Sequence, residues 1–243
     1  MNDKVIVIAG ASGGIGAALA DALARRNARL TLVGRRKGPL TDLADRCTGA
    51  VPVVADMTSR KDVRRVVEET VARAGRIDVW INNVGRGISR LPTELTDDDI
   101  DLMVLINVKS AIYGMQEVLP HLKTRGAGQI INISSMLGRV PFALVRSAYS
   151  GSKSFLNSIT ANFRTEVQAT HPEIQITLVS PGVVATDFGL NALHGGIDSR
   201  VLPGAQSAED VAEVIVGAIE SRRPEVYTRP DGRETVVKYF SEM

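Results

Sequence analysis

A tyrosine and a lysine stand four residues apart in the stretch Ser147-Ala-Tyr149-Ser-Gly-Ser-Lys153. On a helix, two residues at this spacing share one face. An unperturbed tyrosine has a pKa of about 10, and a fixed cation beside it favours the charged phenolate. Tyr149 is therefore a candidate general acid or base. The pair alone also allows another interpretation, a core ring beside a solvated ammonium group.

A glycine-rich stretch follows the first apolar run of the chain. Residues 4–9 form a β-branched run typical of a strand buried on both faces of a parallel sheet, and residues 17–23 have the composition of a helix. A turn between such elements presents backbone N–H groups and a helix N-terminus to an anion, typically a dinucleotide pyrophosphate. A purely structural turn is the alternative. The residues predicted to contact the dinucleotide are Gly10, Ser12, Gly13, Gly14, Ile15 and Gly16.

Two arginines end the second predicted strand, residues 29–33. An acidic residue at this place would bond the ribose hydroxyls of NAD, but the chain has Arg35 and Arg36 instead. A guanidinium suits the 2′-phosphate of NADP, so the sequence favours NADP(H) over NAD(H). Two solvated arginines are the alternative.

Strand and helix patterns alternate along the rest of the chain. Further strands are predicted at 51–55, 77–81, 129–133, 174–179 and 225–227, and helices at 39–46, 59–74, 96–120, 147–170, 208–222 and the tail. This alternation predicts one α/β domain over residues 1–243, a doubly wound parallel sheet of about seven strands with helices on both faces.

Polar turns follow several of these strands. Asp56-Met57 comes after the third strand, where Asp56 can contact a ligand or cap the next helix, and Asn83 and Gly85 come after the fourth. Asn107 is a polar amide inside an apolar helix, where a structural hydrogen bond is the alternative to a catalytic role. Residues 188–204 lack periodicity and are predicted to form a mobile lid over the substrate.

Composition restricts the partners. The 29 basic and 27 acidic residues give a net charge of +2, too balanced to indicate a nucleic-acid or membrane surface. Cys47 is the one cysteine, so no internal disulfide forms, which suits a reducing, cytoplasmic compartment. The three histidines have no metal-ligand spacing, and we expect no metal.

Taken together, these motifs resemble the single-domain branch of the short-chain dehydrogenase/reductase family, from about residue 3 to residue 228. The similarity implies a Rossmann-type fold and an oxidoreductase that interconverts a carbonyl and an alcohol with NADP(H). It is carried by the following residues: Gly10, Gly14, Gly16, Asn82, Asn83, Gly85, Asn107, Ser135, Tyr149, Lys153, Pro181, Gly182, Val184 and Thr186.

The resemblance also implies roles. Tyr149 would exchange a proton with the substrate oxygen, Ser135 would hydrogen-bond that oxygen, Lys153 would hold the nicotinamide ribose, and Asn107 would anchor a relay water. Further cofactor contacts are implied for the adenosine half and the carboxamide: Asp56, Met57, Asn83, Gly85, Pro181, Gly182, Val184 and Thr186. Family members often pair through the helices of Asn107 and Tyr149, so a homodimer or homotetramer is expected.

The sequence also allows predictions about the part of the site that would bind the substrate. Ser135 stands 14 residues before Tyr149, one more than is usual in the family, so we expect a bulge in the loop 142–146. An apolar wall, and hence an apolar small-molecule carbonyl or alcohol substrate, is predicted from Leu137, Val140, Phe142, Leu144, Val183, Phe188, Leu190 and Leu193. The alternative function is an NADP(H)-binding redox sensor or scaffold with little turnover, against which the intact set of four catalytic residues argues.

Overall fold

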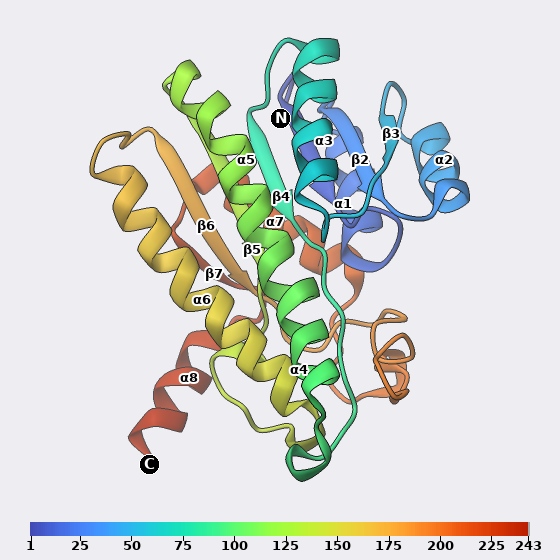
Figure 1. The fold of residues 1–243 in the computed structure, drawn as a ribbon, viewed down its shortest axis with the longest axis vertical. Helices are drawn as coiled ribbons and strands as arrows, with labels where there is room; N and C mark the ends of the chain where they lie inside the picture. Colours follow the sequence, from blue (N-terminus) through green and yellow to red (C-terminus); the bar gives the residue numbers. More distant parts are fainter. Residues whose placement is uncertain (243) are drawn as a thin grey trace.

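The computed structural model describes residues 1–242. Within them, seven strands form one sheet (Figure 1). Its strand order is β3-β2-β1-β4-β5-β6-β7, and every neighbouring pair is parallel. The predicted parallel sheet of seven strands is confirmed. The strands are β1 (Val5–Ala9), β2 (Arg29–Gly34), β3 (Val51–Val54), β4 (Val79–Asn82), β5 (Gly128–Ile133), β6 (Ile174–Ser180) and β7 (Glu225–Tyr227).

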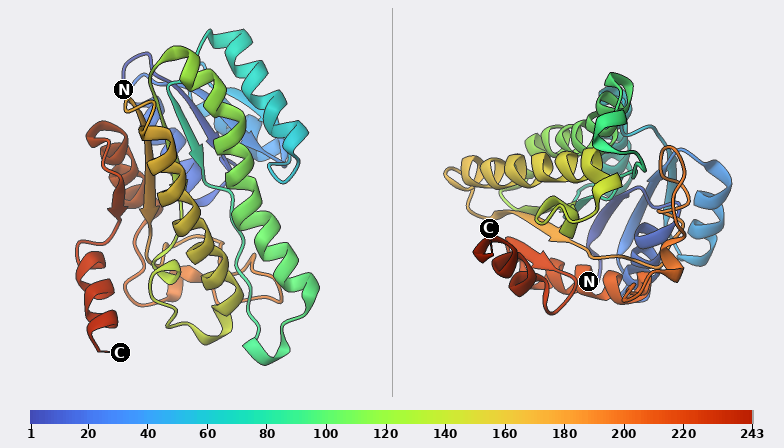
Figure 2. Two further views of the ribbon diagram at one scale, coloured as in Figure 1. Left: turned by 60° about the vertical axis from the view of Figure 1, so that its left-hand side comes forward. Right: turned by 90° about the horizontal axis from the view of Figure 1, so that it is seen from below.

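Helices cover both faces of the sheet, as the view along the sheet in Figure 2 shows. One face is covered by α1 and α7, and the other by α3, α5 and α6. The helices described within residues 1–242 are α1 (Gly14–Ala24), α2 (Lys37–Arg46), α3 (Arg60–Ala74), α4 (Asp97–Val104), α5 (Ser110–Arg125), α6 (Ser147–Gln168), α7 (Ala208–Ser221) and α8 (Gly232–Ser241).

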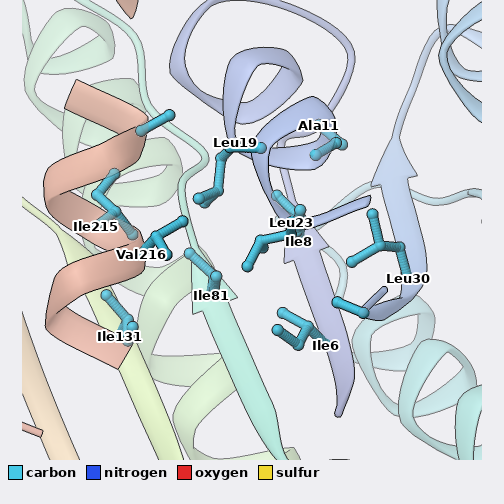
Figure 3. Packing of buried hydrophobic residues seen from close by; sticks show 14 of the residues in the cluster. Ile6, Ile8, Ala11, Leu19, Leu23, Leu30, Ile81, Ile131, Ile215 and Val216 are labelled. Atoms are coloured by element: carbon cyan, nitrogen blue, oxygen red, sulfur yellow. The ribbon is translucent and has the colours of Figure 1, made fainter. Parts of the chain in front are cut away.

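The central strands have continuous apolar sequences because both faces of the sheet are buried there. In β1, Ile6 and Ile8 point to the α1 and α7 side, where Figure 3 shows them packed with Leu19, Leu23 and Ile215. The alternate residues of the same strand point to the opposite layer. Two apolar layers thus hold the carboxyl ends of the strands in a fixed arrangement.

Side-chain caps set where several helices begin. Ser59 accepts a hydrogen bond from the Asp62 amide at the start of α3, and Ser207 caps α7 in the same way. Thr96 and Asp99 form a capping box at the start of α4. Since Ser59 caps α3, Asp56 does not.

The helix that carries Asn107 is longer than predicted and is interrupted. Between α4 and α5 lies a π-helical turn, Leu105–Lys109, and α5 continues through Pro120 to Arg125 instead of ending there. By length and composition alone, the combined helix Asp97–Arg125 could cross a membrane. Its inner face packs on β4, β5, α3 and α6, which accounts for its apolar side chains.

The segment predicted as a lid, residues 188–204, contains one short 3-10 turn and is tied to the chain after β4. Leu193 forms a parallel bridge with Ile88, and its neighbour His194 bonds the buried Asp99 carboxylate at 2.7 Å. Arg90 donates to the same carboxylate at 2.7 Å. These two bonds hold the pKa of Asp99 well below its usual range. The segment is therefore anchored at its middle.

Gly114 allows α5 to approach β4 closely, and this contact can be tested. A Cβ at Gly114 would overlap Asn82 Oδ1 and lie 2.6 Å from Trp80 Nε1. We expect Gly114→Ala to lower the free energy of unfolding by about 1–3 kcal/mol in urea denaturation. Gly217→Ala is the matched control, since a Cβ at this position would have nothing within 4 Å. This change should raise the free energy of unfolding by up to about 1 kcal/mol. Equal effects of the two changes would contradict the close approach.

Candidate active site

Ser135 and Tyr149 meet beyond the end of β5. The Ser135 side chain lies close enough to the Tyr149 phenol to lower its pKa, and the Leu137 amide donates to Ser135 Oγ at 3.1 Å. Ser134 instead donates its hydroxyl to Asn157 Oδ1. The structure therefore places Ser135, and not Ser134, beside the phenol despite the longer spacing. Within the loop predicted to bulge, Leu144–Arg146 form a 3-10 turn directly before α6.

Tyr149 has a pKa shift opposite to the one expected from the Tyr–Lys pair. The ring is 7% exposed and packs in an apolar cluster with Ile88 and Met103. Burial raises the pKa of Tyr149 to about 12, and the nearby Ser135 hydroxyl and the Arg146 charge oppose this only in part. In this structure the phenol is therefore protonated at neutral pH.

Lys153 is buried and does not contact the phenol oxygen directly. Its Nζ donates to the Ile133 carbonyl at 2.8 Å and lies 5.8 Å from the centre of the Tyr149 ring. Burial lowers the pKa of Lys153 to about 8. Gly138 makes this packing possible, because a Cβ there would lie 2.8 Å from Lys153 Cβ. The ammonium is thus fixed at the end of β5 and titrates near neutral pH.

Asn107 lies in the π turn and is fully buried. Its Oδ1 accepts from the Arg86 amide at 2.9 Å, and its Nδ2 donates to the Arg86 carbonyl at 3.0 Å. A Cβ at Gly85 would lie 3.2 Å from Asn107 Oδ1 and 3.6 Å from Lys153 Nζ, so the amide and the ammonium face the same narrow space. Asn107 holds the chain after β4, and its water-anchoring role stays a prediction.

The glycine turn after β1 has the tight geometry of an anion cradle. Gly10 and Gly14 have φ of 83° and 53°, the left-handed region that favours glycine. Asn83 Nδ2 donates to the Gly10 carbonyl at 3.0 Å, and a Cβ at Gly16 would overlap that same carbonyl. A Cβ at Gly14 would lie 3.4 Å from Thr186. The close packing of the turn thus requires glycine at these positions, and the turn leads into the N-terminus of α1, where backbone N–H groups suit an anion.

Arg36 closes one side of this cradle. Its Nη2 donates to the Ser12 carbonyl at 3.1 Å and would lie 3.6 Å from a Cβ at Gly13. Arg35 is exposed at the end of β2. Neither guanidinium has a carboxylate within 4.0 Å among residues 1–242. Both keep free donors for a phosphate, although only Arg36 touches the glycine turn.

The remaining predicted cofactor residues lie at the same edge of the sheet. Asp56 follows β3 and uses Oδ1 to accept from Thr58, while the Met57 side chain is 3% exposed and packs in the core. Met57 is thus buried, and its predicted contact with the adenine stays a prediction. After β6, the Pro181 carbonyl accepts from the Met136 amide at 2.8 Å. Gly182, Val184 and Thr186 then lead the chain back to Gly14.

The predicted apolar wall is brought together only in part. Phe188 packs against Tyr149 with ring centres 5.5 Å apart, and Leu193 packs in the Tyr149 cluster. Phe142 and Leu144 are 68% and 64% exposed, and Val140 is buried. Within residues 1–242, no three His, Cys, Asp or Glu side chains gather as a metal site would need.

Arg146 is a site residue that the sequence analysis missed. It lies half-buried three residues before Tyr149, and its charge acts on the phenol. The available signal was a basic residue only three positions before Tyr149. Because α6 starts at Ser147, the side chain of Arg146 is carried by the turn that leads into the helix.

Comparisons with known proteins agree with the fold and identify the family. The short chain dehydrogenase family model matches residues 4–194. An uncharacterized oxidoreductase of Staphylococcus saprophyticus is 34% identical over 227 residues, 90% of this chain and 92% of the relative. The chain therefore belongs to the short-chain dehydrogenase/reductase family and is an oxidoreductase.

Solved structures show the same architecture. A short-chain dehydrogenase/reductase from Burkholderia phymatum in complex with NAD has a TM-score of 0.90 at 22% identity, covering 99% of this chain and 94% of that chain. A short-chain dehydrogenase from Burkholderia cenocepacia in complex with NADP has a TM-score of 0.83 at 28% identity, with 99% and 94% covered. Proteins of this fold thus occur with either nicotinamide dinucleotide.

The buried ammonium of Lys153 has a measurable cost in stability. Its pKa falls from 10.5 to about 8 on folding, so below pH 8 the folded protein must hold a charge that it disfavours. We expect Lys153→Met to raise the free energy of unfolding at pH 7 by roughly 2 kcal/mol, allowing for the lost hydrogen bond. The measurement is urea denaturation of the protein without added cofactor.

Urea denaturation at pH 9 tests whether the free energy of unfolding changes with pH in the expected direction. Between pH 7 and 9 the native Lys153 loses its proton while the unfolded lysine keeps it, so wild-type stability should rise by roughly 1 kcal/mol relative to Lys153→Met. The exposed Lys61→Met is the control and should show no such pH difference. A Lys153→Met protein that is less stable than wild type at both pH values would contradict the cost of burial.

Proposed function

We propose that the protein is an NADP(H)-dependent reductase that converts a ketone or aldehyde into an alcohol, with Tyr149 as the proton donor. One observation carries this proposal: a protonated phenol, a serine hydroxyl and a buried ammonium converge beyond the end of β5. The phenol has a pKa of about 12 and the ammonium a pKa of about 8. At neutral pH the site therefore holds the proton that carbonyl reduction consumes.

The glycine turn and the arginines support the choice of cofactor. The turn after β1 and the N-terminus of α1 suit a pyrophosphate, and relatives of this fold are found with NAD and with NADP. Arg36 lies over Ser12, and no acidic residue stands at the end of β2. Since a guanidinium binds phosphate bidentately, a 2′-phosphate is the group that best fits this edge.

Each catalytic residue then has a distinct task. A bound NADPH supplies the hydride to the carbonyl carbon. The Tyr149 phenol donates its proton to the carbonyl oxygen, and Ser135 donates a hydrogen bond to the same atom and thus stabilises the developing negative charge. Lys153 holds a proton close to the phenolate that forms, and Asn107 keeps the chain beyond Gly85 in place.

The reverse reaction uses the same groups, but the protonation states favour reduction. Oxidation of an alcohol needs the phenolate as a base, and burial disfavours that form of Tyr149. Phe188 and Leu193 give the space before Tyr149 an apolar side, which fits a substrate with a hydrocarbon portion. The segment 188–204, tied to Ile88 through Leu193, is proposed as the lid over that substrate.

The outer face of α4 and α6 supports self-association. Ile100 and Phe155 are 47% and 52% exposed on this face and line an apolar groove between the helices, together with Leu95 and Met103. A second copy of the chain presents the same apolar side chains and can cover them by two-fold symmetry. We propose that the protein forms a homodimer or homotetramer through this face.

Cofactor titration tests the first half of the proposal. We expect NADPH to bind about 10–100-fold more tightly than NADH in a titration followed by nicotinamide fluorescence, as one charge-assisted phosphate contact would give. Arg36→Gln should weaken NADPH by a similar factor and leave NADH unchanged, and Arg35→Gln tests the second arginine. Arg46→Gln, at the other end of α2, is the control. Tighter binding of NADH would overturn the NADP(H) assignment.

Removal of the Tyr149 hydroxyl tests the second half. We expect Tyr149→Phe to lower kcat by two to four orders of magnitude, roughly the range of general acid catalysis, while NADPH affinity stays within about threefold. The readout is NADPH oxidation with benzaldehyde and acetophenone. Tyr113→Phe on α5, where Arg60 stacks on the ring, is the control. A Tyr149→Phe enzyme that keeps a tenth of the activity would remove Tyr149 from this role. Tight NADPH binding by a wild-type protein without turnover would favour the sensor instead.

A further inference from the structure

Arg146 is a cation next to the proposed proton donor that no step of the proposed reaction uses. It ends the 3-10 turn Leu144–Arg146, directly before α6 and three residues before Tyr149. Its Nη1 donates to the Ile88 carbonyl at 3.0 Å. This bond fixes one end of the guanidinium against the chain that follows β4.

The guanidinium lies between two segments that face the phenol. A Cβ at Gly87 would lie 2.8 Å from its Nη1, and one at Gly196 would lie 2.9 Å from its Nη2. A Cβ at Gly87 would also lie 3.1 Å from the Phe188 ring, and this ring packs against Tyr149. Arg146 therefore lies between the chain after β4 and the segment 188–204, beside Phe188, and its charge acts on Tyr149.

No acidic side chain neutralises Arg146. Among residues 1–242, no carboxylate comes within 4.0 Å of it, and the one ionisable group whose charge acts on it is Tyr149. Two other arginines of this region differ in this respect. Arg90 pairs with Asp99, and Arg200 pairs with Asp187 and Asp198.

Most of the donors of Arg146 have no protein partner. A guanidinium has five N–H donors, and one of them is bonded here. None of the nitrogens of Arg146 is among the fully enclosed polar atoms without a partner, so its unbonded N–H groups remain accessible to a ligand. A half-buried cation that lacks a counter-charge costs free energy, and a ligand carboxylate would offset that cost through two parallel hydrogen bonds.

We propose that Arg146 binds a carboxylate of the substrate, so that the preferred substrate is an oxo acid whose carboxylate lies a few bonds from the carbonyl. This inference rests on the proposed function. Phe188 packs on the hydrocarbon portion, the Tyr149 phenol meets the carbonyl oxygen, and the guanidinium holds the acid group. One hydride from NADPH adds to the carbonyl carbon and one proton from Tyr149 adds to its oxygen, which yields a hydroxy acid and NADP⁺.

Matched pairs of acids and methyl esters test this assignment. The probes are phenylglyoxylate, 4-oxo-4-phenylbutanoate and 5-oxo-5-phenylpentanoate, each beside its methyl ester, with NADPH oxidation as the readout. We expect wild-type kcat/KM to favour at least one acid over its ester by 10-fold or more. Arg146→Gln should lower kcat/KM for that acid about 30–100-fold, mainly through KM, and change the ester less than threefold.

Two further variants serve as controls for the role of the Arg146 guanidinium. Arg146→Lys keeps the charge but loses the planar fork, so the ratio of acid to ester should fall about tenfold while the fold is retained, which a thermal melt checks. If Arg146→Gln does not fold, this variant carries the test. Arg73→Gln on α3 removes one exposed charge far from the site and should leave every ratio unchanged.

Several results would overturn the assignment. Wild-type enzyme that turns over the esters but not the acids would refute the carboxylate role and leave the reductase function intact. Equal losses for acid and ester in Arg146→Gln, with a shifted pH profile, would show that the charge acts through the pKa of Tyr149 instead. If wild type reduces neither acids nor esters, nor the simple aldehydes and ketones, the proposed function fails and this inference fails with it.

Discussion

The burial of the Lys153 ammonium at the end of β5 is the constraint on which the site depends. A charged group can be placed there because Ile133 offers its carbonyl at 2.8 Å and because Gly138 lets its turn close on α6. The same packing fixes the position of Tyr149 one helical turn earlier and presses its ring against Ile88 and Met103. Burial of this charge lowers the stability of the fold, and it places the proton donor Tyr149 and the titrating Lys153 in the same site.

The parallel sheet explains why residues from distant parts of the chain meet there. Strands that run in one direction bring the turns after β1, β4, β5 and β6 to a single edge, so Gly14 lies beside Thr186 and Gly85 lies beside Lys153. The interruption of the long helix by a π turn serves the same end. It places the buried Asn107 amide against both backbone groups of Arg86 and so holds the chain that borders the site.

Charge is distributed unevenly around this edge. The dinucleotide side has Arg36 over the glycine turn, and the substrate side has Arg146 beside the phenol, both without a carboxylate partner among residues 1–242. Other arginines pair with acids, as Arg90 does with Asp99. Two of the arginines without such a partner thus lie where anionic ligand groups are expected.

The sequence alone determined the fold class, the seven strands and the identity of the motif residues, because buried strands and glycine turns have local signatures such as residues 4–16. It also predicted Ser135 and not Ser134 as the catalytic serine, and in the structure the Ser134 hydroxyl donates to Asn157. Tertiary structure decided what depends on burial and on distant neighbours. The pKa of Tyr149 rises because its ring is enclosed, the helix passes Pro120 because its inner face is packed, and Arg146 faces the phenol because two segments far apart in sequence hold it there. Desolvation and packing of this kind are set by the assembled core, and no spacing within the chain encodes them.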